Sequence, residues 1–446
     1  MLIRIRTTVP IVLCLLCPVL LCAQAPLELS LKQAIDLALN SDRNTRLAIA
    51  AESAEAAETR LAESRAAQRP VVDGSLREQN QRVNLAAMGL DSVKIPVPGF
   101  TFPDRVGPFN TFDARASVTY SVVDLAARRR TRASAAGVEV AKAETDTTRN
   151  QIAADVTTSY VAALRADAAV DAAQADIDLA NALLKQAQDR EEAAHGLAID
   201  ITRARAQISA SQQQFIAAES NRERAHLQLL SAIDLNLDTP VRLTDPLRFT
   251  GVPAPSVAEA VALAQKSRPE FAVFQKRETN TQLNQDAIRS ERLPSVVAYG
   301  DYGALVGGTS HSAETYTAGV ALRVPLFDGG RRDSRITETA VEQRLDQLRQ
   351  RDLRTQIELE IRQSLASLRA AELQVKSSDE QVALAEEELA QSRRRFDAGL
   401  SGILEVIEAQ TRLARARDNH VEALFRYQQA RVDLSRATGT IRDLNL

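Results

Sequence analysis

The sequence predicts a mostly α-helical chain that also contributes strands to a β-barrel. Three observations support this fold class. First, proline is absent from residues 110–239 and 326–446, two long stretches rich in the helix-favouring residues Ala, Glu, Gln, Arg and Leu. Second, a seven-residue hydrophobic repeat runs through both stretches and indicates coiled-coil packing. Third, short segments before each repeat alternate between apolar and polar residues, which is typical of β-strands.

Composition excludes several classes of protein. Only 4% of the 446 residues are aromatic and none is Trp, which is a poor match to an enzyme interior. The formal net charge is −3 with both signs evenly represented, so no basic footprint for nucleic acid is present. No internal run approaches the roughly 18 apolar residues of a membrane helix, which excludes a helical transmembrane transporter.

The first residues resemble an export signal. Arg4 and Arg6 form a basic start, residues 9–21 are apolar, and a cleavage site precedes Gln24, so residues 1–23 are predicted to be a signal peptide. All cysteines of the chain lie inside this segment, and none follows the small residue that a lipoprotein signal needs: Cys14, Cys17 and Cys22. The mature chain is therefore predicted to lack disulfides and Cys-ligated metals.

The two halves of the chain match each other. Landmarks recur in the same order, for example Pro70 with Pro294 and the sequence Gly196-Leu197 with Gly399-Leu400. This pattern indicates an internal duplication. The predicted division is a first structural repeat, a linker, a second repeat and a C-terminal tail: residues 24–234, 235–255, 256–440 and 441–446.

Each half is predicted to contain a helix, two strands, a very long helix and a final helix. In the first half, with Ser30 as N-cap, these are residues 30–68, 70–85, 112–123, 124–194 and 198–233. In the second half they are residues 256–292, 294–306, 314–326, 328–398 and 401–438. A helix of about 71 residues spans roughly 106 Å. Two helices of about 37 residues, placed end to end, would lie beside each long one.

The heptads of the long helices pair one large with one small residue. The large residues of the second long helix are Ile361, Leu368, Val375, Val382, Leu389 and Phe396, and the corresponding positions of the first are Val156, Ala163, Val170, Ile177 and Leu184. A small residue follows three positions after each. A period of seven indicates left-handed packing, and small residues permit a close layer of many antiparallel helices. A generic antiparallel coiled coil remains an alternative.

The strands have the length of outer-membrane strands. Residues 114–122 and 316–324 alternate apolar with polar over roughly ten residues. A half-buried hairpin in a soluble protein is the alternative. Four strands cannot close a barrel, and open edges are not tolerated in lipid. Two chains would give a filled eight-stranded barrel, whereas three chains give twelve strands around a lumen.

Four short segments together resemble the TolC-type outer-membrane efflux protein family, whose members are outer membrane factors. These segments are residues 29–40, 324–332, 396–410 and 427–439. The resemblance implies a homotrimer in which a shared 12-stranded outer-membrane β-barrel continues into a trimeric α-barrel in the periplasm. It also implies a passive exit duct of a tripartite efflux or type I secretion system. The implied partners are a periplasmic adaptor (membrane fusion) protein and an inner-membrane pump or ABC transporter. A periplasmic coiled-coil adaptor is the alternative.

No catalytic, cofactor-binding or metal-binding constellation is visible, because the four histidines are isolated. Gly196 and Gly399 mark the predicted helix-turn tips. The resemblance places a periplasmic acidic gate at Glu405 and Glu408, with Asp200 as the matching residue of the first half. The alternative is that these acids only favour the helix dipole.

The predicted strand-to-helix junctions are Asp124 in the first half and Asp328-Gly329-Gly330 in the second. Arginine runs follow both junctions, at residues 128–130 and 331–332. Two interpretations stay open for them. They contact lipid phosphates at the inner membrane interface, or they start solvated helices with Asp124 and Asp328 as N-caps. The outward loops are predicted at residues 86–111 and 306–312.

Overall fold

The computed structural model describes seven ranges of the chain: residues 26–40, 44–89, 97–99, 101–193, 197–251, 253–307 and 312–445. The predicted signal peptide, Gly196 and most of the loop at 306–312 lie outside these ranges. Within them, no helix is both long and apolar enough to cross a bilayer.

The elements follow the predicted order, with several additions. The first half contains β1 (Leu27–Leu29), α1 (Leu31–Ala38), α2 (Thr45–Ala66), β2 (Val71–Asn84), the short 3-10 helix η1 (Ala86–Met88), β3 (Arg105–Val123), α3 (Leu125–Glu192) and α4 (Ala198–Ala232). The second half contains β4 (Val241–Leu243), α5 (Val257–Ser267), α6 (Pro269–Ser290), β5 (Ser295–Val306), β6 (Ser312–Arg323), α7 (Arg331–Asp397), α8 (Ile403–Thr438) and the 3-10 helix η3 (Ile441–Asp443).

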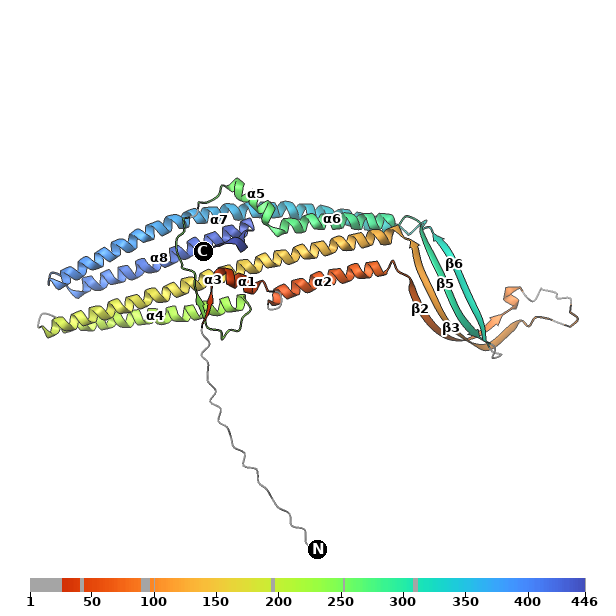
Figure 1. Ribbon diagram of the computed structural model, residues 1–446, viewed down its shortest axis with the longest axis horizontal. Helices are drawn as coiled ribbons and strands as arrows, with labels where there is room; N and C mark the ends of the chain where they lie inside the picture. Colours follow the sequence, from red (N-terminus) through yellow and green to blue (C-terminus); the bar gives the residue numbers. More distant parts are fainter. Residues whose placement is uncertain are drawn as a thin grey trace, which may run out of the picture.

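The helices form an elongated body with the sheet at one end (Figure 1). The two longest helices, α3 and α7, contain 68 and 67 residues, so each spans about 100 Å. Beside α3 lie α2 near the sheet and α4 at the far end, while α6 and α8 accompany α7 in the same way. The shorter helices thus lie end to end beside the long ones, as the sequence predicted.

The four-stranded sheet is antiparallel, in the order β2-β3-β5-β6. Its register aligns Val72 with Val118 and, one position along, Asp73 with Ser117. The side chains therefore alternate between an apolar face and a polar face, as predicted for a membrane barrel. Strands β2 and β6 form the edges, and neither has a second partner among the described residues.

Two helices that were predicted to be continuous are interrupted. The predicted helix 30–68 divides into α1 and α2, and Asn44 caps α2 by accepting a hydrogen bond from the Leu47 amide at 3.1 Å. Asn caps compete with a continuous helix. The predicted helix 256–292 divides at Arg268, whose backbone is extended. Pro269 follows, and a residue before proline is disfavoured in the helical conformation.

The ends of two other elements were also predicted wrongly. Strand β3 begins at Arg105 rather than at residue 112, so the connection from β2 is shorter than 86–111. The three-residue strands β1 and β4 were not predicted, although they pair in parallel with each other. Strand β4 lies in the predicted linker. Such short strands carry no periodicity that a sequence pattern could detect.

The heptad positions lie in the core, as predicted. In α7 nearly all large and small positions are buried: Ile361, Ser364, Leu368, Ala371, Val375, Ser378, Ala385, Leu389, Ser392 and Phe396. Ala371 belongs to an apolar cluster that contains Tyr427 of α8, and Ala385 to one that contains Val406 of α8. The small residues therefore allow α7 and α8 of the same chain to approach closely.

Overpacking this contact is expected to destabilise the protein. We expect Ala371→Leu with Ala385→Leu to cost roughly 1–3 kcal/mol per site, because each added side chain enters a filled core. A lower midpoint of thermal unfolding checks this. The control is Ala366→Leu with Ala383→Leu, which adds the same volume at exposed positions of α7. Equal midpoints for the two double variants would contradict close α7–α8 packing.

Candidate functional sites at the two ends of the helices

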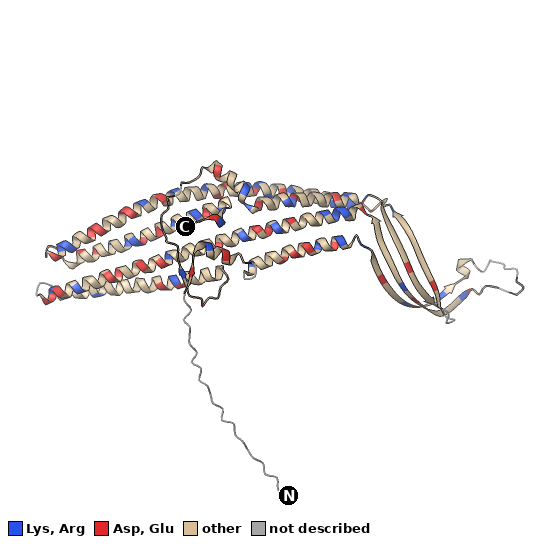
Figure 2. Cartoon of the chain, viewed as in Figure 1, with Lys and Arg blue, Asp and Glu red and all other residues tan. Residues whose placement is uncertain are grey.

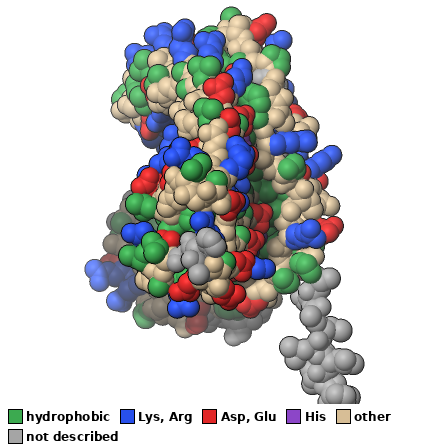
Figure 3. Space-filling view, turned by 90° about the vertical axis from the view of Figure 1, so that its left-hand side faces the viewer, with side chains coloured by type: hydrophobic (Ala, Val, Ile, Leu, Met, Phe, Trp, Pro, Cys, Tyr) green, Lys and Arg blue, Asp and Glu red, His purple; other side chains and the backbone are tan. Residues whose placement is uncertain are grey.

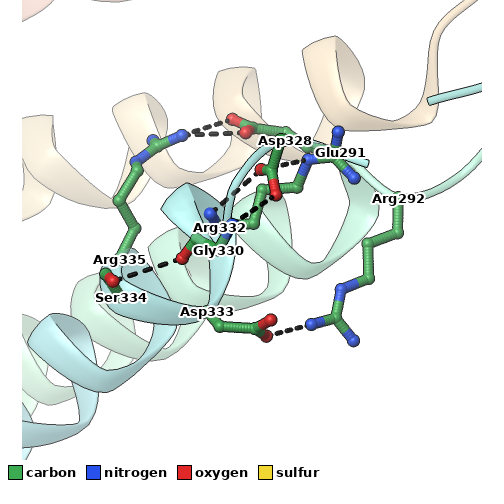
Figure 4. Close-up of polar contacts among 8 residues, drawn as sticks. All are labelled: Glu291, Arg292, Asp328, Gly330, Arg332, Asp333, Ser334 and Arg335. Carbon is green, nitrogen blue, oxygen red and sulfur yellow. Dashed lines mark hydrogen bonds and ion pairs between the residues drawn. The ribbon is translucent and has the colours of Figure 1, made fainter. Parts of the chain in front are cut away.

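The junction between β6 and α7 is built around Asp328 (Figure 4). Its carboxylate accepts hydrogen bonds from the backbone amides of Gly330 at 3.3 Å and Arg332 at 3.1 Å. The N-cap is Gly330 rather than Asp328, so α7 begins at Arg331, three residues after the predicted start. Gly329 and Gly330 have φ of +68° and +84°, and this left-handed turn favours glycine.

The junction between β3 and α3 is simpler. Asp124 is the N-cap of α3, and its Oδ1 accepts a hydrogen bond from the Ala127 amide at 2.8 Å. An acidic side chain at this position satisfies one of the free amides of the first helical turn and complements the helix dipole. The carboxylates of Asp124 and Asp328 therefore both accept hydrogen bonds from backbone amides at the starts of the two long helices.

Arginine side chains connect the helices at the end that adjoins the sheet. The guanidinium of Arg335 on α7 donates two hydrogen bonds to Glu291, which follows α6, at 2.8 and 3.0 Å. The ion pair between Arg292 and Asp333 joins the same two helix ends (Figure 4). On the neighbouring helix, Arg129 of α3 donates to Ser290 of α6 at 2.6 Å. These bonds hold α3, α6 and α7 together where the strands begin and end.

The turn between α7 and α8 lies at the opposite end of the molecule, onto which Figure 3 looks. Gly399 has a φ of +68°, and the Leu400 amide donates to the Arg395 carbonyl at 2.9 Å, which ends α7 in a Schellman-type turn. The Arg190 guanidinium of α3 stacks on the Phe396 ring, 4.3 Å from its centroid. This contact links the end of the first hairpin to that of the second.

Each predicted gate acid has an arginine beside it. Glu405 lies 3.2 Å from Arg395, and Glu408 lies 3.9 Å from Arg412. Asp200 similarly lies 3.7 Å from Arg203. Asp200 and Glu405 lie in the first turns of α4 and α8, and Glu408 lies in the second turn of α8. These are the ends of the helices remote from the sheet, where both acidic and basic residues occur (Figure 2). The arginines were not singled out from the sequence, although the spacings of three and four residues would have shown two of them.

A partly buried ionic network was also missed. Asp176 of α3 lies 3.7 Å from Arg417 of α8, and Arg417 lies 3.4 Å from Glu386 of α7. Only 11% of the Asp176 side chain is exposed, and this burial raises its pKa to about 6 despite the attraction of Arg417. Burial also raises the pKa of the neighbouring Asp418. The network joins the hairpin α3–α4 to the hairpin α7–α8.

Two of the histidines bridge neighbouring helices. His226 of α4 lies 2.8 Å from Asp167 of α3, and His420 of α8 lies 3.2 Å from Asp379 of α7. Among the described residues, no group of three or more His, Cys, Asp and Glu side chains is arranged to hold a metal ion.

The comparisons with known proteins agree with this architecture. Residues 260–440 match the family described as outer membrane efflux protein. The pyoverdine export outer membrane protein OpmQ of Pseudomonas putida is 24% identical over 345 residues, which cover 74% of this chain and 70% of OpmQ.

Solved structures show that the fold is shared along nearly the whole chain. VceC of Vibrio cholerae superposes with a TM-score of 0.71 at 17% identity, covering 92% of this chain and 96% of VceC. MtrE of Neisseria gonorrhoeae, solved in an open state, has a TM-score of 0.71 at 18% identity and covers 92% and 88%. Residues 260–440 therefore match the outer membrane efflux protein family, and nearly the whole chain has the fold of the outer membrane protein VceC and the outer membrane channel MtrE.

Proposed function

We propose that three copies of this chain close around one axis and form the passive exit duct of a tripartite efflux or type I secretion system. The observation that carries this proposal is the open sheet. Its edge strands β2 and β6 have free hydrogen-bonding edges among the described residues, and its apolar face is exposed, with Tyr316 79% accessible. Such edges are not tolerated in lipid, so β6 of one copy must pair with β2 of the next.

The helices have matching open edges. Far from the sheet, α3 packs between α4 and α8, and α8 packs on α7, so α4 and α7 are outermost. Near the sheet, α2 and α7 are outermost. Large apolar side chains are exposed along α7: Val341, Leu345, Leu348, Leu359, Leu373 and Leu384. Ile49 of α2 and Ile216 of α4 are also exposed. A neighbouring copy would cover these residues.

The further parts of this proposal concern organisation and partners. The chain is two structural repeats, residues 24–234 and 256–440, joined by a linker at 235–255; the equivalence of α3 with α7 and of α4 with α8 supports this. The duct does no chemistry. A periplasmic adaptor and an inner-membrane pump deliver the cargo, and the similarity to OpmQ, a pyoverdine export protein, supports pyoverdine-like compounds as the cargo to test first.

The test combines location, assembly and conductance. The expected result is a trimer in the outer-membrane fraction that dissociates on heating before electrophoresis, and that conducts ions in a planar bilayer. A monomer in the soluble periplasm would overturn the proposal.

Topology has its own test. The connection between β2 and β3 lies at the end of the sheet remote from the helices (Figure 1). We expect a protease added to whole cells to cut between residues 85 and 104 and to spare residues 130–230. The fragments are mapped by mass spectrometry, with lysed cells as the control. Cleavage of intact cells within 130–230 would show the opposite orientation.

A further inference from the structure

Exposed arginines occur where strands meet helices. The chain passes between a helix and the four-stranded sheet four times, all at one end of that sheet (Figure 1), in residues 65–70, 124–132, 286–292 and 323–335. Arginines outnumber carboxylates twelve to five in these segments, although the whole chain has a net charge of −3. Basic charge is therefore concentrated in one band beside the sheet, which Figure 2 shows at the helix ends.

The arginines of this band are of two kinds. Arg129, Arg332 and Arg335 are bound to neighbouring groups of the same chain, as described above. Five others, which lie outside the strands, are exposed and form no side-chain hydrogen bond or ion pair with any described residue: Arg65, Arg69, Arg128, Arg132 and Arg331. We name these five the arginine collar. Because no described residue binds their guanidinium groups, those groups are available to an external anion.

An apolar band adjoins the arginine collar on the strand side. Leu326 and Phe327, between β6 and α7, are 91% and 88% exposed. The exposed Val71 and Val72 follow Arg69 and Pro70 in the chain, and exposed apolar residues precede Arg128: Val122, Val123 and Leu125. In each case the change from apolar to cationic takes only a few residues. This order matches a bilayer interface, where hydrocarbon gives way to a layer of phosphate groups.

We propose that the arginine collar, together with Leu326 and Phe327, binds anionic phospholipids of the periplasmic leaflet. The guanidinium groups contact the phosphates, which they match in charge and in bidentate geometry. The apolar side chains lie among the acyl chains just above. The inference rests on the proposed orientation, in which the helices extend into the periplasm, and it fixes the height of the barrel in the membrane.

The experiment is native mass spectrometry of the purified trimer with equal amounts of phosphatidylglycerol and phosphatidylcholine. The variant Arg69→Gln/Arg128→Gln/Arg331→Gln removes three collar charges per chain. The control Arg205→Gln/Arg351→Gln/Arg369→Gln removes three exposed arginines of α4 and α7 that lie outside the collar and have no ion-pair partner among the described residues. At about a fivefold effect per arginine near an anionic headgroup, we expect the collar variant to lose its preference for phosphatidylglycerol by about tenfold or more.

Further measurements distinguish contacts with the lipid headgroup from contacts with the acyl chains, and lipid binding from binding of a free anion. Leu326→Ser/Phe327→Ser should weaken retention of both lipids alike, because the acyl contacts do not depend on the headgroup. Soluble glycerophosphate should not displace the lipid; full displacement would show a site for free anions and overturn the proposal. Equal retention of phosphatidylglycerol by wild type and the collar variant would overturn it as well. Trimer formation and conductance are measured in the same variants, so a failure of the proposed duct is seen separately.

Discussion

Neutralising the two acids at the start of α8 is expected to change conduction far more than stability. In the trimer proposed here, Glu405→Gln with Glu408→Gln removes six carboxylates from the periplasmic end of the duct. If these side chains ring the pore, they attract cations into it and allow a multivalent cation to bridge neighbouring copies. We expect the variant to show lower cation selectivity, and weaker block by multivalent cations added from the periplasmic side, in single-channel recordings.

Removing Arg395, the ion-pair partner of Glu405, should have the opposite effect on cation selectivity and block. Arg395→Gln leaves Glu405 unpaired, so it should raise cation selectivity and strengthen block. A pair of exposed acids on α2, Glu52 and Glu55, is the charge-matched control, because α2 lies in the half of the helical body next to the sheet. Glu52→Gln/Glu55→Gln should leave both measurements at wild-type values.

The rival explanation makes a different prediction. If Glu405 and Glu408 only stabilise the start of α8, neutralising them costs roughly 0.3–1 kcal/mol per helix and leaves conduction alone. A small fall in the unfolding midpoint with wild-type selectivity and block would therefore reject the gate.

Much of the fold could be predicted because its determinants are repetitive. The long helices α3 and α7 show their buried face every seven residues, and the strands show theirs every second residue, so both can be recognised from sequence spacing. Even the need for further copies follows from the number of strands. The breaks at Asn44 and Arg268 and the strands β1 and β4 depend on single residues or on three-residue pairings, which leave no period.

The candidate sites were only partly predictable for a related reason. Asp328 and the two glycines after it were identified because a turn requires those residue types at adjacent positions. Arg395 and Arg417, in contrast, meet partners on other helices, and no local spacing connects Arg417 with Asp176. That Arg128 and Arg331 have no side-chain partner among the described residues likewise emerges only from the structure.

The buried carboxylate of Asp176 is expected to make stability fall as pH rises. Its pKa is about 6 in the folded protein and 3.8 as the ordinary value, so the folded state binds the proton more tightly than the unfolded state. The stabilisation is complete below about pH 4 and is lost as pH rises through about 6. A shift of two pKa units corresponds to about 3 kcal/mol, which is an upper estimate for this partly paired group.

The environment of Asp176 contains the groups that decide this effect. From α8 it faces Arg417 and Asp418, with Arg415 nearby, and from α4 only the uncharged Gln207, Ser211 and Gln214. Glu386 of α7 shares Arg417. Because Arg417 interacts with both acids, its attraction offsets the desolvation of Asp176 only in part. Once ionised, the Asp176 carboxylate therefore destabilises the contact between the hairpins α3–α4 and α7–α8.

The variant Asp176→Asn should therefore lose this part of the pH dependence. The unfolding midpoint of the variant minus that of wild type is expected to increase from pH 4.5 to pH 7.5. Both proteins are measured in the same detergent and at one scan rate, because unfolding of such assemblies is governed by kinetics. Asp178→Asn, an exposed position of the same helix, is the matched control and should follow wild type at both pH values. An equal difference in unfolding midpoint between Asp176→Asn and wild type at both pH values would contradict this prediction. Asp176 would then not titrate over this range, because its ion pair with Arg417 keeps it charged throughout.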